Sequence, residues 1–267
     1  MRLIWSIAFA MAAAGCASFR AQPVEQPIRV VTYNIQYGAG GLQNVADALR
    51  RMNADIVTLQ EVDVHWHQRS GFADQASELA ASLRMEMRFA PIYRVAGDSG
   101  RPMREFGVAL LSKHPIESFR NDSLTRLSTQ VANPVPALAP GLLNAVVNVG
   151  GQRINVLTAH LDYRANPSVR RAQVAEILRL LSDTIPTILA GDFNATPDAD
   201  ELQPLFRRLH DVWLVSSNLG LTFPSAAPAK RIDYILTSGL RAALVEVVPA
   251  TASDHRPVSA SLSIVRR

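Results

Sequence analysis

From residue 28 onward, short runs rich in β-branched residues alternate with amphipathic stretches. The short apolar runs have the length and composition of strands, and the amphipathic stretches repeat their apolar residues at helical spacing. Strands are predicted at 28–35, 55–60, 107–112, 142–149, 152–160, 187–190, 231–237, 243–248 and 257–264, and helices at 42–52, 74–83, 167–182 and 198–209. The mixture of hairpins and helical crossovers predicts an α/β layered fold with much antiparallel pairing.

Two segments without periodicity are predicted as loops within this single domain, which spans residues 28–265. One is the Pro- and Ala-rich stretch 133–141, and the other is 224–229. Gly150 and Gly151 lie between two apolar runs, which is a strong signal for a two-residue hairpin turn. The chain has no internal repeat and no low-complexity segment.

The N-terminus has the pattern of a bacterial lipoprotein signal. Arg2 precedes an apolar stretch at 3–14, which is too short for a stable bilayer span, and small residues lead to Cys16. We expect residues 1–16 to end at an acylated Cys16, and residues 17–27 to form a polar tether. Ala17 is not acidic, which favours an outer-membrane anchor facing the periplasm. The alternative is that the chain is cleaved near this position and secreted without a lipid anchor.

The composition narrows the class of protein. Of 267 residues, 48% are hydrophobic and 19% are charged, so a folded core is expected and global disorder is excluded. No apolar run beyond the N-terminus could span a bilayer, which excludes a multispan membrane protein. The single cysteine excludes an intrachain disulfide and a cysteine-based zinc site. The net charge of +4 comes from scattered arginines, without the basic stripe of a nucleic-acid-binding protein.

Polar and ionisable residues recur where apolar strands end or begin. Such groups are costly at these positions unless they face a site or a hydrogen-bonding partner. Taken alone, each has an ordinary explanation as a turn residue, a cap or a buried hydrogen-bonded side chain. Together they predict a polar site, made of Asn34, Glu61, His160, Asp192, Asn194, Asp233, Asp254 and His255.

The motifs around these residues resemble those of the endonuclease/exonuclease/phosphatase superfamily, the DNase I-like metal-dependent phosphoesterases. They read TYNIQYG, LQEVD, GVALLSKHPI, LTAHLD, GDFNATP, RIDYIL and SDHRPV, in that order. The combination is specific, although each piece alone is only suggestive. The resemblance covers residues 28–262 and implies a four-layer α/β/β/α sandwich with two packed, largely antiparallel mixed sheets.

The resemblance also implies a metal site. Glu61 matches a metal carboxylate, while Asn34 and Asp254 lie near the same metal and ligate it directly or through water. Hard oxygen ligands of this kind suit Mg²⁺, with Mn²⁺ as the alternative.

The remaining site residues are implied to act on phosphate and water. Asp192 orients or deprotonates the attacking water, and Asn194 bonds the phosphate or orients that water. Asp233 orients His255 and raises its pKa, so that the imidazole can place positive charge on the phosphate. His160 contacts the phosphate or protonates the leaving group.

The expected function is metal-dependent hydrolysis of a phosphodiester by in-line attack of water, by a monomer. Arg69 and Arg104 are candidates for substrate contact at the rim. The lipid anchor at Cys16 and the absence of a basic stripe favour a lipid head group or a small phosphodiester. A DNase I-like nuclease acting on nucleic acid is the alternative. A catalytically silent binding lipoprotein is a further alternative, which the intact site residues disfavour.

Overall fold

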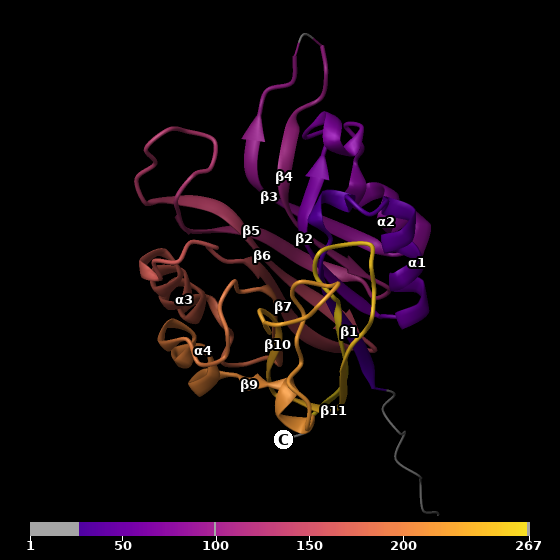
Figure 1. The fold of residues 1–267 in the computed structure, drawn as a ribbon. Coiled ribbons are helices and arrows are strands. Elements are labelled where there is room, and N and C mark those ends of the chain that lie inside the picture. The colour runs from indigo at the N-terminus through magenta and orange to yellow at the C-terminus, as the bar shows by residue number, and fades with distance from the viewer. Residues whose placement is uncertain (1–26, 99, 266–267) are drawn as a thin grey trace, which may run out of the picture.

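The computed structural model describes residues 27–98 and 100–265, which form two six-stranded sheets packed face to face (Figure 1). The first sheet contains, in spatial order, β11 (Leu240–Val247), β12 (Val258–Ile264), β1 (Ile28–Asn34), β2 (Ile56–Val64), β4 (Arg104–Ser112) and β3 (Glu86–Val95). The second contains β5 (Ile116–Arg126), β6 (Ala137–Val149), β7 (Gln152–His160), β8 (Thr187–Asp192), β10 (Asp233–Ser238) and β9 (His210–Asp211).

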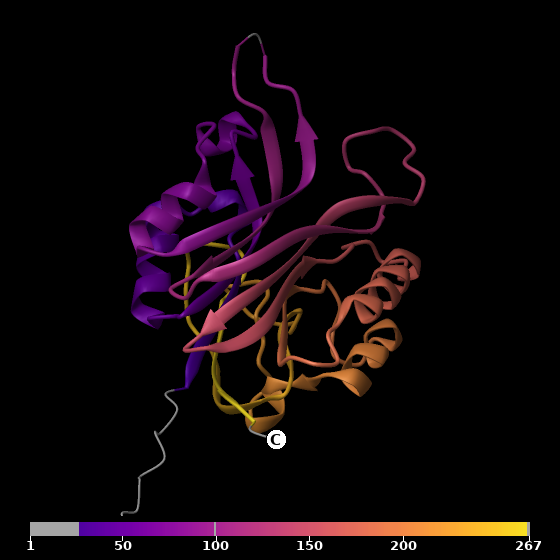
Figure 2. The same cartoon turned by 180° about the vertical axis from the view of Figure 1, so that it is seen from behind.

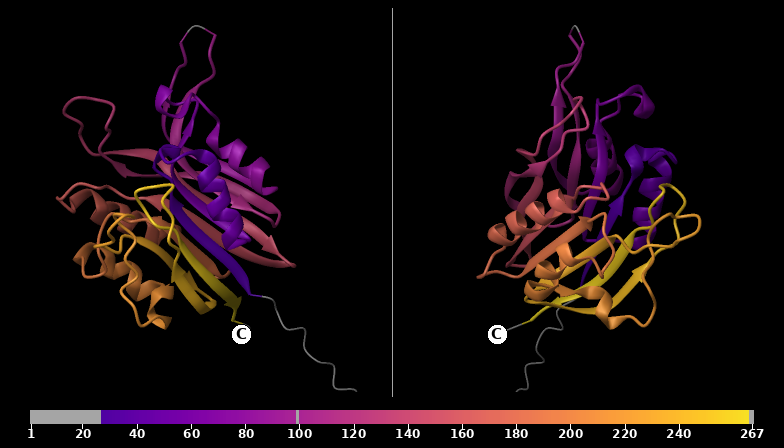
Figure 3. Two further views of the ribbon diagram at one scale, coloured as in Figure 1. Left: turned by 45° about the vertical axis from the view of Figure 1, so that its right-hand side comes forward. Right: turned by 60° about the vertical axis from the view of Figure 1, so that its left-hand side comes forward.

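Helices cover the outer faces of both sheets, so the molecule has four layers (Figures 2 and 3). The α-helices are α1 (Leu42–Met52), α2 (Gln75–Leu83), α3 (Ser168–Leu180) and α4 (Gln203–Arg208). The short 3₁₀ turns are η1 (Gln36–Gly38), η2 (Gln68–Ser70), η3 (Asp200–Leu202) and η4 (Val212–Val215). One hydrophobic cluster joins α1 and α2 to the first sheet, and another joins α3 and α4 to the second. The predicted four-layer α/β/β/α sandwich is confirmed.

The alternation of side chains along β1 shows why its residues form a doubly buried strand. Val30 belongs to the cluster between the two sheets, whereas Val31 and Tyr33 belong to the cluster beneath α1 and α2. Successive side chains of a strand point to opposite faces, and here both faces are buried. A strand that is buried on both faces, as β1 is, therefore needs consecutive apolar residues rather than an alternation of apolar and polar ones.

Strand direction brings the polar strand ends to one edge of the sandwich. β1 runs parallel to β2, and β7 runs parallel to β8, so the carboxyl ends of all four strands lie at this edge. β10 and β12 run antiparallel to β8 and β1, so they present their amino ends there instead. We call this edge the catalytic edge.

Two sequence-based expectations were wrong. The stretch 133–141 was expected to be a loop, but β6 begins at Ala137. Its first residues pair with β5 alone and extend beyond β7, so Pro140, which lacks a backbone N–H, costs little there. The strand expected at 55–60 continues to Val64 through a bulge that contains Glu61.

The edge strands β3 and β5 were not predicted at all. Each lies at the end of its sheet and carries charged residues on its partly exposed face. An edge strand has one unpaired side and is commonly protected by charge, so the apolar pattern is weak there.

The expected lipidation site Cys16 and the tether 17–27 lie outside the described residues, apart from Pro27. Within the described ranges, no helix has the length and apolar character needed to cross a bilayer.

Candidate active site

Asp192 lies at the centre of the catalytic edge. It ends β8 and is buried, directly opposite His160 of β7 and Asp233 of β10 in the sheet register. Its Oδ2 accepts a hydrogen bond of 3.0 Å from Asn34 Nδ2, across the gap between the two sheets. The Nε2 atoms of His160 and His255 lie 3.5 Å and 3.6 Å from the same oxygen. One carboxylate oxygen therefore faces three nitrogen atoms from three separate segments.

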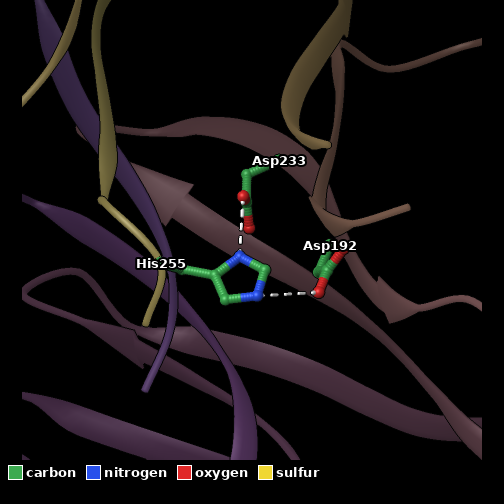
Figure 4. A group of neighbouring side chains, drawn as sticks. All are labelled: Asp192, Asp233 and His255. Atoms are coloured by element: carbon green, nitrogen blue, oxygen red, sulfur yellow. Dashed lines mark hydrogen bonds and ion pairs between the residues drawn. The ribbon is translucent and has the colours of Figure 1, made fainter. Parts of the chain in front are cut away.

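Asp233 and His255 form a buried pair beside Asp192 (Figure 4). His255 Nδ1 and Asp233 Oδ2 are 2.9 Å apart, which leaves Nε2 directed at Asp192. Burial opposes the charged imidazolium, but the charge of Asp233 and its hydrogen bond outweigh burial and raise the pKa of His255 to about 10. The imidazole is thus held as a cation between two carboxyl groups.

The Asp233 carboxyl is itself affected by its burial. Burial raises its pKa; the charge of His255 opposes this rise, and the charge of Asp192 adds to it. Within the described part of the chain, Oδ1 of Asp233 accepts no hydrogen bond. One proton is therefore held along the Oδ2–Nδ1 contact of this pair, which keeps the His255 ring fixed in one orientation.

Glu61 has a more open setting than these groups. It is partly exposed, and it lies in the β2 bulge with a φ of 57°, which turns its side chain away from the regular pleat. Oε1 accepts a hydrogen bond of 3.1 Å from Asn34 Nδ2. Oε2 has no hydrogen-bond partner among residues 27–98 and 100–265. A free carboxylate oxygen at a site edge is suited to bind a cation or water.

Asn34 links the two groups of acidic residues. Its Nδ2 donates to both Glu61 and Asp192, and its Oδ1 accepts from the backbone N–H of Gln36. Both N–H bonds of the Asn34 amide are therefore engaged and link Glu61 to Asp192, while Oδ1 keeps one lone pair beyond the bond from Gln36.

Asp254 is held beside this group by the segment that precedes β12. Its backbone N–H donates to Gln36 Oε1, and its Oδ1 accepts a bond of 3.3 Å from Ser253 Oγ. Ser253 Oγ also lies 2.7 Å from the carbonyl oxygen of Asn34, which ties this segment to the end of β1. The partly exposed Asp254 carboxylate is thus the second oxygen donor on the open side of the site.

Asn194 and Gly191 shape the turn around Asp192. The Asn194 backbone N–H bonds Asp192 Oδ1 at 2.9 Å, and its Nδ2 donates to Leu161 O. Gly191 has a φ of 149°, and a Cβ there would lie 2.0 Å from the carbonyl oxygen of Ala159. Only glycine permits this close approach of β7 and β8, which sets His160 beside Asp192.

A pocket of about 220 Å³ opens next to Glu61 and His160. Its wall is mainly apolar and aromatic. Its lining includes Ile92, Tyr93, Phe106, Leu127, Leu161 and Tyr163. Tyr93 and Phe106 stack at a ring distance of 6.2 Å.

The sequence of this site matches a known family. The model of the Endonuclease/Exonuclease/phosphatase family matches residues 31–255, which include all the groups described above. The chain belongs to this family. Its members are hydrolases of phosphate esters, and the family fold is typically dependent on a divalent metal.

Relatives of this chain cover most of its length. The uncharacterized protein YbhP of Escherichia coli is 27% identical over 264 residues, which span 88% of this chain and 96% of YbhP. A protein of unknown function from Enterococcus faecalis has a similar structure, with a TM-score of 0.70, 19% identity, and coverage of 89% of this chain and 100% of that one. The mannosyl-6-phosphatase Bt3783 of Bacteroides thetaiotaomicron has a TM-score of 0.67, 17% identity and the same coverage.

Two groups of side chains in this family member could hold a metal. Asp192, Asp233 and His255 offer ligand atoms that lie within 4.8 Å of one another. However, both ring nitrogens of His255 face carboxylates, Nδ1 at 2.9 Å from Asp233 and Nε2 at 3.6 Å from Asp192, so neither nitrogen is turned toward an open position. Glu61, Asn34 and Asp254 offer oxygen atoms on the open side, which fits Mg²⁺ and Mn²⁺.

The two rim arginines are engaged with the protein. Arg69 makes a bidentate pair with the buried carboxylate of Asp63, at 3.0 and 2.8 Å, and lies 3.8 Å over the Tyr37 ring. Arg104 Nε donates to the carbonyl oxygen of Trp66 at 2.7 Å. Substrate contact by either residue therefore depends on the nitrogen atoms that these bonds leave free.

Sequence reasoning missed several residues that shape the site. Gln36 and Ser253 hold Asp254 and Asn34, as described above, and Phe223 packs on the His255 ring at 4.8 Å. Arg126 ends β5, and its guanidinium donates to the carbonyl oxygens of Pro140, Gly141 and His160. Burial lowers the pKa of Arg126 to about 10, although nearby acidic groups oppose the shift. Only the position of Gln36 and Ser253 inside the TYNIQYG and SDHRPV motifs could have indicated them.

Proposed function

We propose that this chain is a Mg²⁺-dependent phosphodiesterase that hydrolyses a lipid head-group or small phosphodiester by in-line attack of water. The observation that carries the proposal is the setting of Asp192. Its Oδ2 lies within 3.6 Å of two imidazole Nε2 atoms and accepts a hydrogen bond from Asn34. A carboxylate placed in this way can accept a proton from water beside two groups that can bind a phosphate.

Glu61, with Asn34 and Asp254, is proposed to hold the Mg²⁺, and Mn²⁺ is the alternative. The supporting observation is that two partly exposed carboxylates are tied to Asn34: Glu61 through its Oε1, and Asp254 through Ser253, which bonds the Asn34 carbonyl oxygen. A bound divalent cation neutralises charge on phosphoryl oxygens and activates the bond to the leaving oxygen.

The other catalytic roles are proposed for residues of the chain itself. Asp192 orients the attacking water through Oδ2 and takes its proton. His255, held as a cation by Asp233, donates from Nε2 to a phosphoryl oxygen. The Nδ2 group of Asn194 has one N–H beyond the bond to Leu161, and this N–H is available to the phosphate. His160 lines the pocket, which supports a role for it in donating a proton to the leaving oxygen.

The pocket supports a small or apolar ester group. Tyr93 and Phe106 are among its lining residues, and its volume of about 220 Å³ suits a compact group rather than a long polymer. One observation favours nucleic acid as a second candidate. Tyr163 is 63% exposed at the pocket rim, with the Arg164 guanidinium 5.1 Å from its ring, and exposed aromatic side chains of this kind can stack with bases.

The sequence supports two further parts of the proposal. The N-terminal pattern ending at Cys16 supports export and a lipid anchor at the outer membrane, facing the periplasm, and secretion is the alternative. We also propose that the enzyme acts as a monomer, because all the site residues come from one chain.

The test is an assay of the full chain with Mg²⁺, with Mn²⁺ and with chelator. The substrates are bis-p-nitrophenyl phosphate, sphingomyelin vesicles, p-nitrophenyl phosphate and plasmid DNA. We expect metal-dependent turnover of the diesters and little turnover of the monoester. Preference for DNA with a steep loss of rate at higher salt would support the nuclease instead. No turnover of any substrate with either metal would overturn the proposal in favour of a silent binding protein.

A further inference from the structure

The segment after β9 exposes three large apolar side chains within six residues. Leu214 is 80% exposed, Val215 is 54% exposed and Leu219 is 76% exposed. Single exposed apolar residues are ordinary on a protein surface, but a contiguous group is a sign of an interaction site. These residues belong to η4 and the turn that follows it.

The fold holds this segment in a fixed shape. Trp213 is buried, and its Nε1 donates to the carbonyl oxygen of Asn218 at 2.8 Å. Gly220 packs against the indole so closely that a Cβ would lie 2.3 Å from the Trp213 ring. The backbone N–H of Trp213 is bonded to Asp211 Oδ1. Leu214 and Leu219 are therefore presented outward by an anchored turn.

An apolar groove of about 440 Å³ lies beside the turn. Its lining includes Leu214, Val215, Leu240, Ala242 and Val265. We call Leu214, Val215, Leu219 and this groove the apolar face. The ionisable residues that line the groove are His210, Asp211 and Arg241. Asp211 is neutralised by Arg231 at 2.7 Å, so the net charge of the lining is positive.

The apolar face lies at the end of the sandwich opposite the catalytic edge. Asp233 begins β10 at the site, while Thr237, near the other end of β10, and Leu240, which begins β11, line the groove. At about 3.3 Å per residue, the four steps from Asp233 to Thr237 span about 13 Å. The first residue of β1, Ile28, pairs with Leu262 near the end of the last strand, so β1 begins at this same end (Figures 1 and 3).

We propose that the apolar face docks on the surface of an anionic lipid bilayer. The chain preceding β1 is 27 residues long and contains the apolar stretch 3–14 and Cys16, so this end of the domain is the end nearest any N-terminal membrane attachment. Arg241 lines the groove and supplies positive charge that complements anionic head groups. Stable attachment to a membrane usually needs two weak contacts, and the apolar face supplies the second.

This arrangement fixes the orientation of the enzyme. With the apolar face on the bilayer, the catalytic edge points away from it, by about the length of a strand. The substrate is then reached from the aqueous side. This consequence for the substrate rests on the proposed function, whereas the docking itself does not.

The test uses the full chain with a Cys16→Ser change, so that an introduced cysteine is the single labelling site. The apolar stretch 3–14 is kept in this chain and serves as the other membrane contact. Leu214→Cys and Leu219→Cys each carry an environment-sensitive fluorophore. Val135→Cys is the matched control, because Val135 is also a strongly exposed apolar residue but precedes β6 at the catalytic edge. Each protein is mixed with vesicles of phosphatidylcholine and phosphatidylglycerol that carry brominated acyl chains.

We expect the brominated lipid to reduce emission at positions 214 and 219 at least about twofold, and to leave position 135 unchanged. Equal quenching at all three positions, or no flotation of the chain with the vesicles, would overturn the proposal. A shielded label at 214 before vesicles are added would also overturn it, because a second copy or the chain's own N-terminus would then fill the groove. Shielding by a second copy would increase with protein concentration, whereas shielding by the chain's own N-terminus would not. No readout depends on turnover, so failure here and failure of the proposed reaction are separate results.

Discussion

The two halves of the active site differ in burial and in the state of their ionisable groups. Asp192, Asp233 and His255 are buried and face one another, so their charges are already compensated within the protein. Glu61 and Asp254 are partly exposed, and Glu61 keeps a carboxylate oxygen without a hydrogen-bond donor among the described residues. This difference supports the proposed division, in which the buried half serves proton transfer and phosphate binding and the open half binds a cation.

The largest expected effect comes from the buried half. Asp192→Asn keeps the shape of the side chain but removes its ability to take a proton. We expect kcat to fall on the order of a thousandfold or more. Turnover with saturating metal measures this loss.

The same variant sharpens the comparison when metal binding is measured by calorimetry. If the open half holds the metal, Asp192→Asn should bind Mn²⁺ nearly as well as the unaltered chain. A large loss of Mn²⁺ affinity would instead place Asp192 among the ligands and contradict the division between the halves.

The next effect comes from the open half. Glu61→Gln replaces a charged oxygen donor by a neutral amide, so we expect the affinity for Mg²⁺ or Mn²⁺ to fall about tenfold or more. Activity should return in part as the metal concentration is raised. Removal of metal by chelator should abolish turnover in the unaltered chain. If Glu61→Gln and the unaltered chain turned over substrate equally fast at a low metal concentration, Glu61 would not be a ligand.

A smaller effect is expected on the pH dependence of the free energy of unfolding, through the Asp233–His255 pair of the metal-free protein. The pKa of His255 is raised from its ordinary value to about 10. A raised imidazole pKa stabilises the fold fully below the unfolded pKa near 6.5, and this stabilisation is lost as the pH rises through about 10. The unaltered chain should therefore lose on the order of 3–4 kcal/mol of unfolding free energy between pH 7 and pH 10 from this pair.

Asp233→Asn removes the charge that holds the proton on His255. We expect the His255 pKa to fall well below 10, because burial alone disfavours the cation. Urea unfolding of the variant should then show little of the alkaline loss. NMR titration of the ring gives the pKa directly, and an unchanged His255 titration in the variant would disprove the role of Asp233.

The smallest effect is expected at the pocket rim. Tyr163→Ala removes an exposed ring that touches none of the buried residues of the site, so stability and kcat should hardly change. We expect KM to rise a few-fold for a diester with an aromatic group, corresponding to about 1 kcal/mol of lost contact. A fall in kcat at unchanged KM would mean that Tyr163 acts on the reaction itself.

The sequence alone indicated the candidate site residues that end or begin strands. Asn34, Glu61, His160, Asp192 and Asp233 were predicted because several polar side chains recur beside apolar runs, where each is costly without a purpose, and because their motifs resemble those of one family. This is a local signal, and the parallel and antiparallel pairing of the strands then brings the residues to one edge. The helices and central strands were predicted for the same reason, since their periodicity is also local.

Tertiary structure alone decided which of these residues meet. Asn34 bonds Asp192 across 158 positions of sequence, and no local pattern specifies which side chains of the two sheets face each other. The arginines show the same limit, because a long flexible side chain finds its partner only after packing. Arg69 is bound to Asp63 and Arg126 to three carbonyl oxygens, neither of which the sequence indicated. Residue types and their periodicity determined the elements and the chemistry, whereas the packing of the two sheets determined the contacts that make them a site.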